Sequence, residues 1–162
     1  HDALPIFILK NCIIEKLIYY TNTNKVKGRF SSKSKRKLSM DKATTKELLD
    51  FILESSALVK KRFESIHSSD DFLQNDTGLE KLDAIAMRLQ SIGEALKNLM
   101  KREKELLLKV ADETYWSEII KTRDFISHHY VAIDAEIVFD ICSNEVEELE
   151  KKIIDVKNIL SL

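Results

Sequence analysis

The near-absence of proline constrains the fold of this chain more than any other feature of its sequence. The 162 residues contain one proline, Pro5, and none occurs between Met40 and Leu162. Only three glycines are present. Proline interrupts helices, and all-β proteins need many turns that are rich in glycine and proline. The sequence therefore predicts an all-α fold with long helices from Met40 onward.

Charge is unevenly distributed along the chain, although the formal net charge is only −1. Residues 1–39 carry nine Lys or Arg and two acidic residues, which leaves 17 basic and 25 acidic residues, a net −8, for residues 40–162. An acidic domain is a poor general binder of nucleic acid. Any nucleic acid that it binds must therefore be held by a local basic groove or by a partner. The length fits a single core.

Two cysteines, Cys12 and Cys142, are too few to indicate a disulfide framework or a zinc site, so we expect a reducing, cytoplasmic environment. The most apolar segment, residues 6–20, is interrupted by Lys10, Glu15 and Lys16. It is therefore not an uninterrupted apolar run of the ~18–20 residues that a membrane span requires. No membrane association is predicted.

The first 39 residues are interpreted as a non-native extension. His1 to Ile6 resembles the translation of a common short-read sequencing adapter, and no methionine precedes Met40. Our hypothesis is that translation starts at Met40, so that residues 40–162 form the domain. The alternative is that Lys25 to Lys37 is a basic arm for nucleic acid or membrane. A peptide from residues 1–39 in the natural protein, found by mass spectrometry, would contradict the hypothesis.

Capping signals and apolar spacing predict four or five antiparallel helices in an up-down bundle. Capping boxes are expected at Thr44 and at Thr77, and the N-caps of two later helices at Ser117 and Asp134. A kink is expected near Ser143 in the last helix. Residues 101–112 are expected to form a short helix or to extend the second helix. The clearest apolar stripe belongs to the second helix: Leu82, Ile85, Ala86, Leu89, Ile92, Leu96 and Leu99. Gly93 interrupts this stripe, which indicates close helix packing.

Arg123, His128 and Tyr130 fall within two turns of one predicted helix. Arginine can hold a phosphate bidentately, and histidine can transfer a proton near neutral pH without a metal. At 100° per residue, Tyr130 shares the stripe of Arg123, and His128 lies about 140° round the helix. His129 is adjacent to His128, so the two are poorly placed to chelate one metal ion, and no metal or cofactor is predicted. The pattern favours phosphodiester cleavage, although this spacing also recurs by chance.

Four segments in the expected order resemble one family. The segment from Arg123 to Tyr130 resembles the Arg-x4-His-x-Tyr motif of HepT toxins, the HEPN-superfamily partners of minimal nucleotidyltransferase (MNT) antitoxins. The other three segments are Arg88 to Ala95 (Arg-x3-Ile-Gly-Glu-Ala), Trp116 to Ile119 (Trp-x-x-Ile) and Ile133 to Val138. The family's usual Trp after Val138 is Phe139 here, and a frequent Pro before the last helical segment is absent.

The resemblance implies a HEPN-type helical bundle and a metal-independent endoribonuclease whose two active sites meet across a homodimer. In this interpretation His128 transfers protons and Arg123 stabilises the charge on phosphorus. Asp124 either orients one of these two groups or is an ordinary exposed helix acid. Tyr130 matches the tyrosine that family members present to the antitoxin for adenylylation; the alternative is a helix-end aromatic packed on the core.

Arg88, Glu94 and His129 are possible groove residues, although an ion pair within or between helices explains Arg88 and Glu94 as well. Two other functions remain open. The domain is either a catalytically silent scaffold that binds a nucleotide or the neighbouring nucleotidyltransferase, or a generic helical dimerisation domain. An intact Arg123/His128 pair favours the enzyme, and the acidic net charge favours the scaffold.

Overall fold

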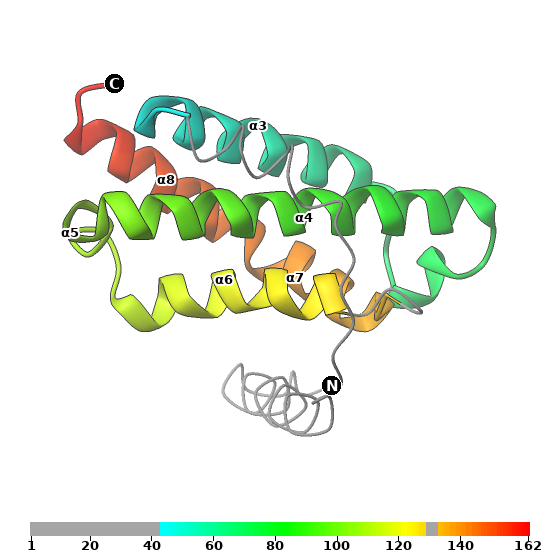
Figure 1. The fold of residues 1–162 in the computed structure, drawn as a ribbon. Helices are drawn as coiled ribbons and strands as arrows, with labels where there is room; N and C mark the ends of the chain where they lie inside the picture. The colour runs from blue at the N-terminus through cyan, green and yellow to red at the C-terminus, as the bar shows by residue number, and fades with distance from the viewer. Residues whose placement is uncertain (1–42, 129–132) are drawn as a thin grey trace, which may run out of the picture. The chain divides into compact units, whose positions relative to one another are not determined.

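The structure, a computed structural model, describes residues 43–128 and 133–162, and within these ranges it contains six α-helices and no strand (Figure 1). The elements are α3 (Thr45–Phe63), the 3-10 helix η1 (Ser69–Phe72), α4 (Asp76–Arg102), α5 (Lys104–Leu107), α6 (Glu113–His128), α7 (Ala135–Asn144) and α8 (Val146–Ile159). The all-α prediction is confirmed. The predictions for residues 1–39, His129 and Tyr130 lie outside the described residues. No helix in the described ranges has the length and apolarity needed to cross a membrane.

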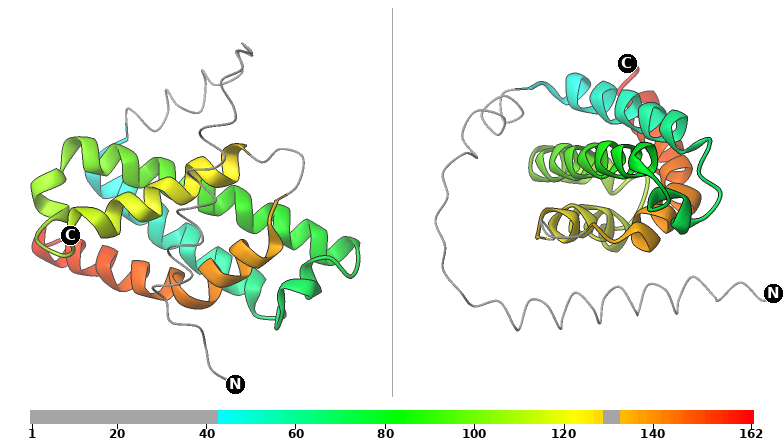
Figure 2. Two further views of the ribbon diagram at one scale, coloured as in Figure 1. Left: turned by 90° about the horizontal axis from the view of Figure 1, so that it is seen from below. Right: turned by 90° about the vertical axis from the view of Figure 1, so that its right-hand side faces the viewer.

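Helix α4 is the centre of the bundle. It packs on α3 along one side and on α6 along the other, and α8 packs against α3. The right-hand view of Figure 2 shows α4 between these two neighbours, with α7 and α8 closing a third side. Along the chain the long helices alternate in direction, as the colours of Figure 1 show. This up-down arrangement follows from the predicted stripe of α4, whose seven apolar residues are all buried.

Two of the predicted helix starts are confirmed. At the start of α3 the Thr44 hydroxyl accepts the backbone N–H of Glu47 (3.2 Å), and the Glu47 carboxylate accepts the N–H of Thr44 (2.7 Å). At the start of α7 the Asp134 carboxylate accepts two backbone N–H groups, from Glu136 (3.0 Å) and Ile137 (3.2 Å). Both caps satisfy N–H groups that have no partner within the helix.

Two other predicted starts are wrong, because a better acceptor lies a few residues earlier. Helix α4 begins at Asp76, not after Thr77, since the Asn75 side chain accepts the N–H of Gly78 (2.9 Å). Helix α6 begins at Glu113, so Ser117 is not its N-cap but lies inside the helix. The Asp112 carboxylate accepts the N–H of Tyr115 at 2.8 Å and performs the capping.

The last predicted helix is divided into α7 and α8 at Glu145, which accounts for one helix beyond the expected number, and α5 is a separate single turn. Just before the division, Ser143 donates its hydroxyl to the carbonyl of Phe139 (2.8 Å), and Asn144 donates its amide to the carbonyl of Asp140 (3.2 Å). Side-chain bonds of this type to the preceding turn bend helices. The expected kink is thus a break. Leu160, which follows the last residue of α8, is 36% exposed.

Gly78 allows η1 to lie directly on the first turn of α4. A Cβ at this position would come within 2.4 Å of the carbonyl oxygen of Asp71 and 2.8 Å of that of Phe72. These are backbone atoms, so Gly78→Ala is expected to lower the free energy of unfolding by about 1–3 kcal/mol in urea titrations. Thr77→Ala, at an exposed neighbouring position, is the control. Equal stability of the two variants would contradict the close contact.

Cys142 is half-buried and free, and burial raises the pKa of its thiol from 9.0 to about 12. Since the thiolate is the reactive form, the folded protein at pH 8 is expected to react with iodoacetamide about 1,000-fold more slowly than the urea-unfolded chain. Peptide mass spectrometry would measure the labelling of Cys142 against time. Equal rates in the two states would contradict the burial of this thiol.

Candidate active site

Trp116 fixes the beginning of the helix that carries the candidate arginine. Its side chain is fully buried, and its indole N–H is shared between the carbonyls of Leu107 (3.0 Å) and Ala111 (3.2 Å). These two carbonyls belong to the end of α5 and to the turn that leads into α6. The indole therefore ties this turn to the first part of α6, and this bond sets where α6 begins along α4.

The contact between Gly93 and Arg123 sets the distance between α4 and α6 at the candidate site. A Cβ on Gly93 would lie 2.3 Å from the Cβ of Arg123 and 3.5 Å from its Cα. The distance of 2.3 Å is far below van der Waals contact, and a Cβ cannot move without its backbone. The predicted close packing at Gly93 is confirmed. Sequence reasoning did not identify Arg123 as the neighbour.

Glu94, the next residue on α4, forms an ion pair with Arg123. The distance from Glu94 Oε2 to Arg123 Nη2 is 2.7 Å. The two side chains are only 18% and 23% exposed, and Glu94 Oε2 and Arg123 Nε are shielded from solvent. An ion pair with little exposure to water is stronger than an ordinary surface pair. Of the two predicted alternatives for Glu94, the ion pair between helices is the one that the structure contains.

Arg88 is half-buried on α4. It lies six residues before Glu94, which at 100° per residue places it about 120° away round the helix. Helical geometry thus places Arg88 on a different side of α4 from Glu94, although both residues belong to the same predicted motif.

The backbones of Asp124 and His128 belong to α6, which includes His128 as its last residue. Their side chains lie outside the described part of the structure, as do His129 and Tyr130 altogether. The roles predicted for these four residues therefore remain predictions. The described half of the candidate site is the arginine with its two neighbours on α4.

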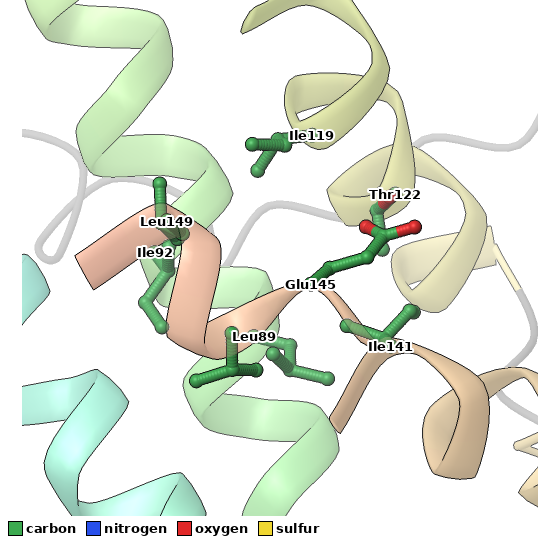
Figure 3. Close-up of a pocket in the computed structure, with 8 residues that line it drawn as sticks. Leu89, Ile92, Ile119, Thr122, Ile141, Glu145 and Leu149 are labelled. Carbon is green, nitrogen blue, oxygen red and sulfur yellow. The ribbon is translucent and has the colours of Figure 1, made fainter. Parts of the chain in front are cut away.

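A small cavity is enclosed by α4, α6 and the junction of α7 and α8 (Figure 3). In Figure 3 the carboxylate of Glu145 points towards α6, where Thr122 lies. The volume of about 20 Å³ has room for one water molecule but not for a nucleotide. Its other lining residues are apolar: Leu89, Ile92, Ile119, Ile141, Val146 and Leu149. A buried small-molecule site is therefore not the function of this cavity.

A guanidinium held rigidly beside a helix surface is suited to binding a phosphate or stabilising charge on phosphorus. It keeps its positive charge at every physiological pH, and its planar N–H groups match the geometry of phosphate oxygens. The Glu94 carboxylate lowers the conformational freedom of Arg123, so less entropy is lost when a phosphate binds. The chemistry available at this position is thus anion recognition by an already ordered arginine.

Comparison with known proteins assigns the chain to a family. The family model described as Ribonuclease HepT-like matches residues 52–156. The protein named "Putative RNase TTE0752", from Caldanaerobacter subterraneus subsp. tengcongensis, is 33% identical over 113 residues, which cover 70% of this chain and 94% of that protein.

Two proteins of Methanocaldococcus jannaschii are also similar. "Putative RNase MJ0127" is 34% identical over 92 residues, covering 54% of this chain and 70% of the relative. "Gamma-glutamylcyclotransferase and putative RNase MJ0434" is 27% identical over 108 residues, covering 67% of this chain but only 45% of that longer protein. No solved structure matches the chain significantly. From the family model and these relatives, the chain belongs to the HepT-like ribonuclease family.

Proposed function

We propose that this protein is a metal-independent endoribonuclease in which Arg123 and His128 act on the RNA phosphate. The observation that carries the proposal is the family match over residues 52–156, which includes both residues. The ordered position of Arg123 against Gly93 and Glu94 supports it, because a cleavage site needs its positive charge in place before the reaction.

In the proposed reaction the 2′-hydroxyl of the RNA attacks the adjacent phosphorus. A base removes the hydroxyl proton, the bond from phosphorus to the 5′-oxygen breaks, and an acid protonates that oxygen. His128 transfers the protons, and Arg123 stabilises the negative charge on the pentacoordinate phosphorus. Since base and acid are both needed, we propose that two subunits of a homodimer contribute one His128 and one Arg123 each across the two-fold axis.

The test is to incubate purified protein with a structured RNA in EDTA and to follow fragments on a denaturing gel. The wild type is expected to cleave. Arg123→Ala and His128→Ala are each expected to cleave at least about 100-fold more slowly. The matched controls are His67→Ala and Lys121→Ala, which remove an exposed histidine and an exposed basic residue of α6. Induced expression in a bacterial host would show growth arrest and RNA fragments for the wild type and the controls.

Folded, dimeric wild-type protein that leaves RNA intact and does not slow growth would contradict the ribonuclease proposal. The acidic charge of residues 40–162 would then favour the alternative function, a scaffold for a nucleotide or a nucleotidyltransferase. Cleavage that is equally fast in His128→Ala and wild type would leave the ribonuclease but contradict the role of His128.

We further propose that the protein is the toxin of a two-component toxin–antitoxin pair, and that an MNT-type nucleotidyltransferase inactivates it by adenylylating Tyr130. The phenol oxygen would attack the α-phosphate of ATP, AMP would be transferred and pyrophosphate released. The added negative charge and bulk would oppose binding of the RNA phosphate. Intact mass spectrometry after incubation with such an enzyme and ATP is expected to show one added AMP in wild type and none in Tyr130→Phe.

A further inference from the structure

We propose that Glu94 is the positioning residue for Arg123, holding the guanidinium in the orientation that RNA cleavage requires; this inference rests on the proposed ribonuclease function. Glu94 is on α4 and Arg123 on α6, so the pair crosses between two helices that pack along each other. The role is separate from catalysis itself, because Glu94 acts through the arginine.

The position of Arg123 is fixed at both ends of its side chain. At its base, the Cβ lies on Gly93, where no larger residue fits. At its tip, Nη2 is 2.7 Å from Glu94 Oε2. Between them the Nε atom is shielded from solvent. An exposed arginine samples many rotamers, and ordering it when RNA binds would cost up to about 2 kcal/mol of side-chain entropy. Here consecutive residues of α4 supply both restraints.

Glu94 also carries a negative charge beside a group that must attract phosphate. A residue that served only RNA binding would not be acidic, because its charge opposes the approach of the phosphate. Positioning explains the acid, since a carboxylate attracts a guanidinium and the two groups form an ion pair here. The two effects act on different steps. Loss of the negative charge strengthens binding of RNA, and loss of the orientation slows its cleavage.

The structure therefore predicts opposite changes in two kinetic constants for Glu94→Gln. This variant keeps the shape of the side chain and removes its charge. In steady-state cleavage of a short RNA, kcat is expected to fall by about 10- to 100-fold, as for a misplaced catalytic group, while KM stays the same or decreases. Glu80→Gln is the matched control, because it makes the same change at an exposed position of α4 and is expected to leave both constants unchanged.

A second measurement does not depend on activity. In ¹⁵N-detected NMR spectra, a guanidinium held by a carboxylate gives separate Nη signals, whereas a freely rotating one gives averaged signals. Arg123 is expected to give separate signals in wild type and in Glu80→Gln, and averaged signals in Glu94→Gln. The Arg123→Lys spectrum would assign them.

The outcomes separate this inference from the function on which it rests. Wild-type protein without cleavage activity would contradict the ribonuclease proposal, and the NMR comparison would still decide whether Glu94 orders Arg123. Active wild type with an equal kcat in Glu94→Gln would contradict only the role of Glu94. A higher kcat/KM in Glu94→Gln with an unchanged kcat would also overturn it, since Glu94 would then merely weaken RNA binding.

Discussion

Gly93→Ala is expected to lower RNA cleavage by about 100-fold per folded molecule, because the added methyl group displaces Arg123, the proposed catalytic arginine. Its Cβ would lie 2.3 Å from that of Arg123, so α6 must move away from α4 by more than 1 Å to reach ordinary contact. Such a shift would also lengthen the ion pair between Arg123 and Glu94, now 2.7 Å. Alanine favours the helix by up to about 1 kcal/mol relative to glycine, which offsets part of the packing cost.

The measurement compares the cleavage rate and the urea midpoint of Gly93→Ala with those of Gly78→Ala. Both variants place a Cβ on a buried glycine of α4, but Gly78 contacts η1 and not α6. Gly78→Ala is expected to lose stability and to retain its rate per folded molecule. Full activity of Gly93→Ala would show that the close approach of α4 and α6 at this point is not needed for the reaction.

Trp116→Ala is expected to lower the free energy of unfolding by about 3–5 kcal/mol. The substitution empties a fully buried space and leaves the carbonyls of Leu107 and Ala111 without their indole donor. A domain of this size has a total stability of about 5–15 kcal/mol, so the variant is expected to be partly unfolded at 37 °C. Circular dichroism during urea titration measures the loss.

Two conservative variants separate the contributions. Trp116→Phe keeps most of the bulk and removes the donor, and should cost about 1–3 kcal/mol. Tyr115→Phe removes a buried hydroxyl that has no hydrogen-bond partner among the described residues, so it should leave stability unchanged or slightly higher. If Trp116→Ala unfolded at the same urea concentration as the wild type, the indole would not anchor the start of α6.

The long-range pattern of the fold could be predicted from the sequence, and the helix ends only in part. The apolar stripe of α4 has a period that only a helix buries, so the existence of that element followed directly. The prediction of Thr77 as a cap rests on the capping-box spacing to Glu80, and that of Ser117 rests on residue type. Asn75 and Asp112 have equally suitable side chains, and which acceptor reaches the free N–H groups depends on the path of the preceding turn.

The candidate site, too, could be predicted from the sequence only in part. The sequence predicts that Arg123 and His128 share one helix, because residue type and spacing determine which groups a helix carries, and the structure has both residues on α6. The contact of Arg123 with Gly93 and Glu94 could not be predicted, because residues 29 or 30 positions apart meet only through the packing of α4 on α6. The sequence did contain an indication of this contact. A glycine followed by an acid, within the most regular apolar stripe of the chain, fits no requirement of the helix itself.

The pairing of α3 with α8 affects how the protein folds during synthesis. Asp50 on α3 bonds to Lys157 on α8, 107 residues later in the chain. At about 5–20 residues per second the ribosome needs about 5–20 s to make that segment. Once α4 has been made, α3 can pack on it but not yet on α8, so part of the apolar surface of α3 stays uncovered. The newly made chain is therefore most exposed to aggregation and to proteases just before its last helix emerges, and chaperones have several seconds in which to bind it.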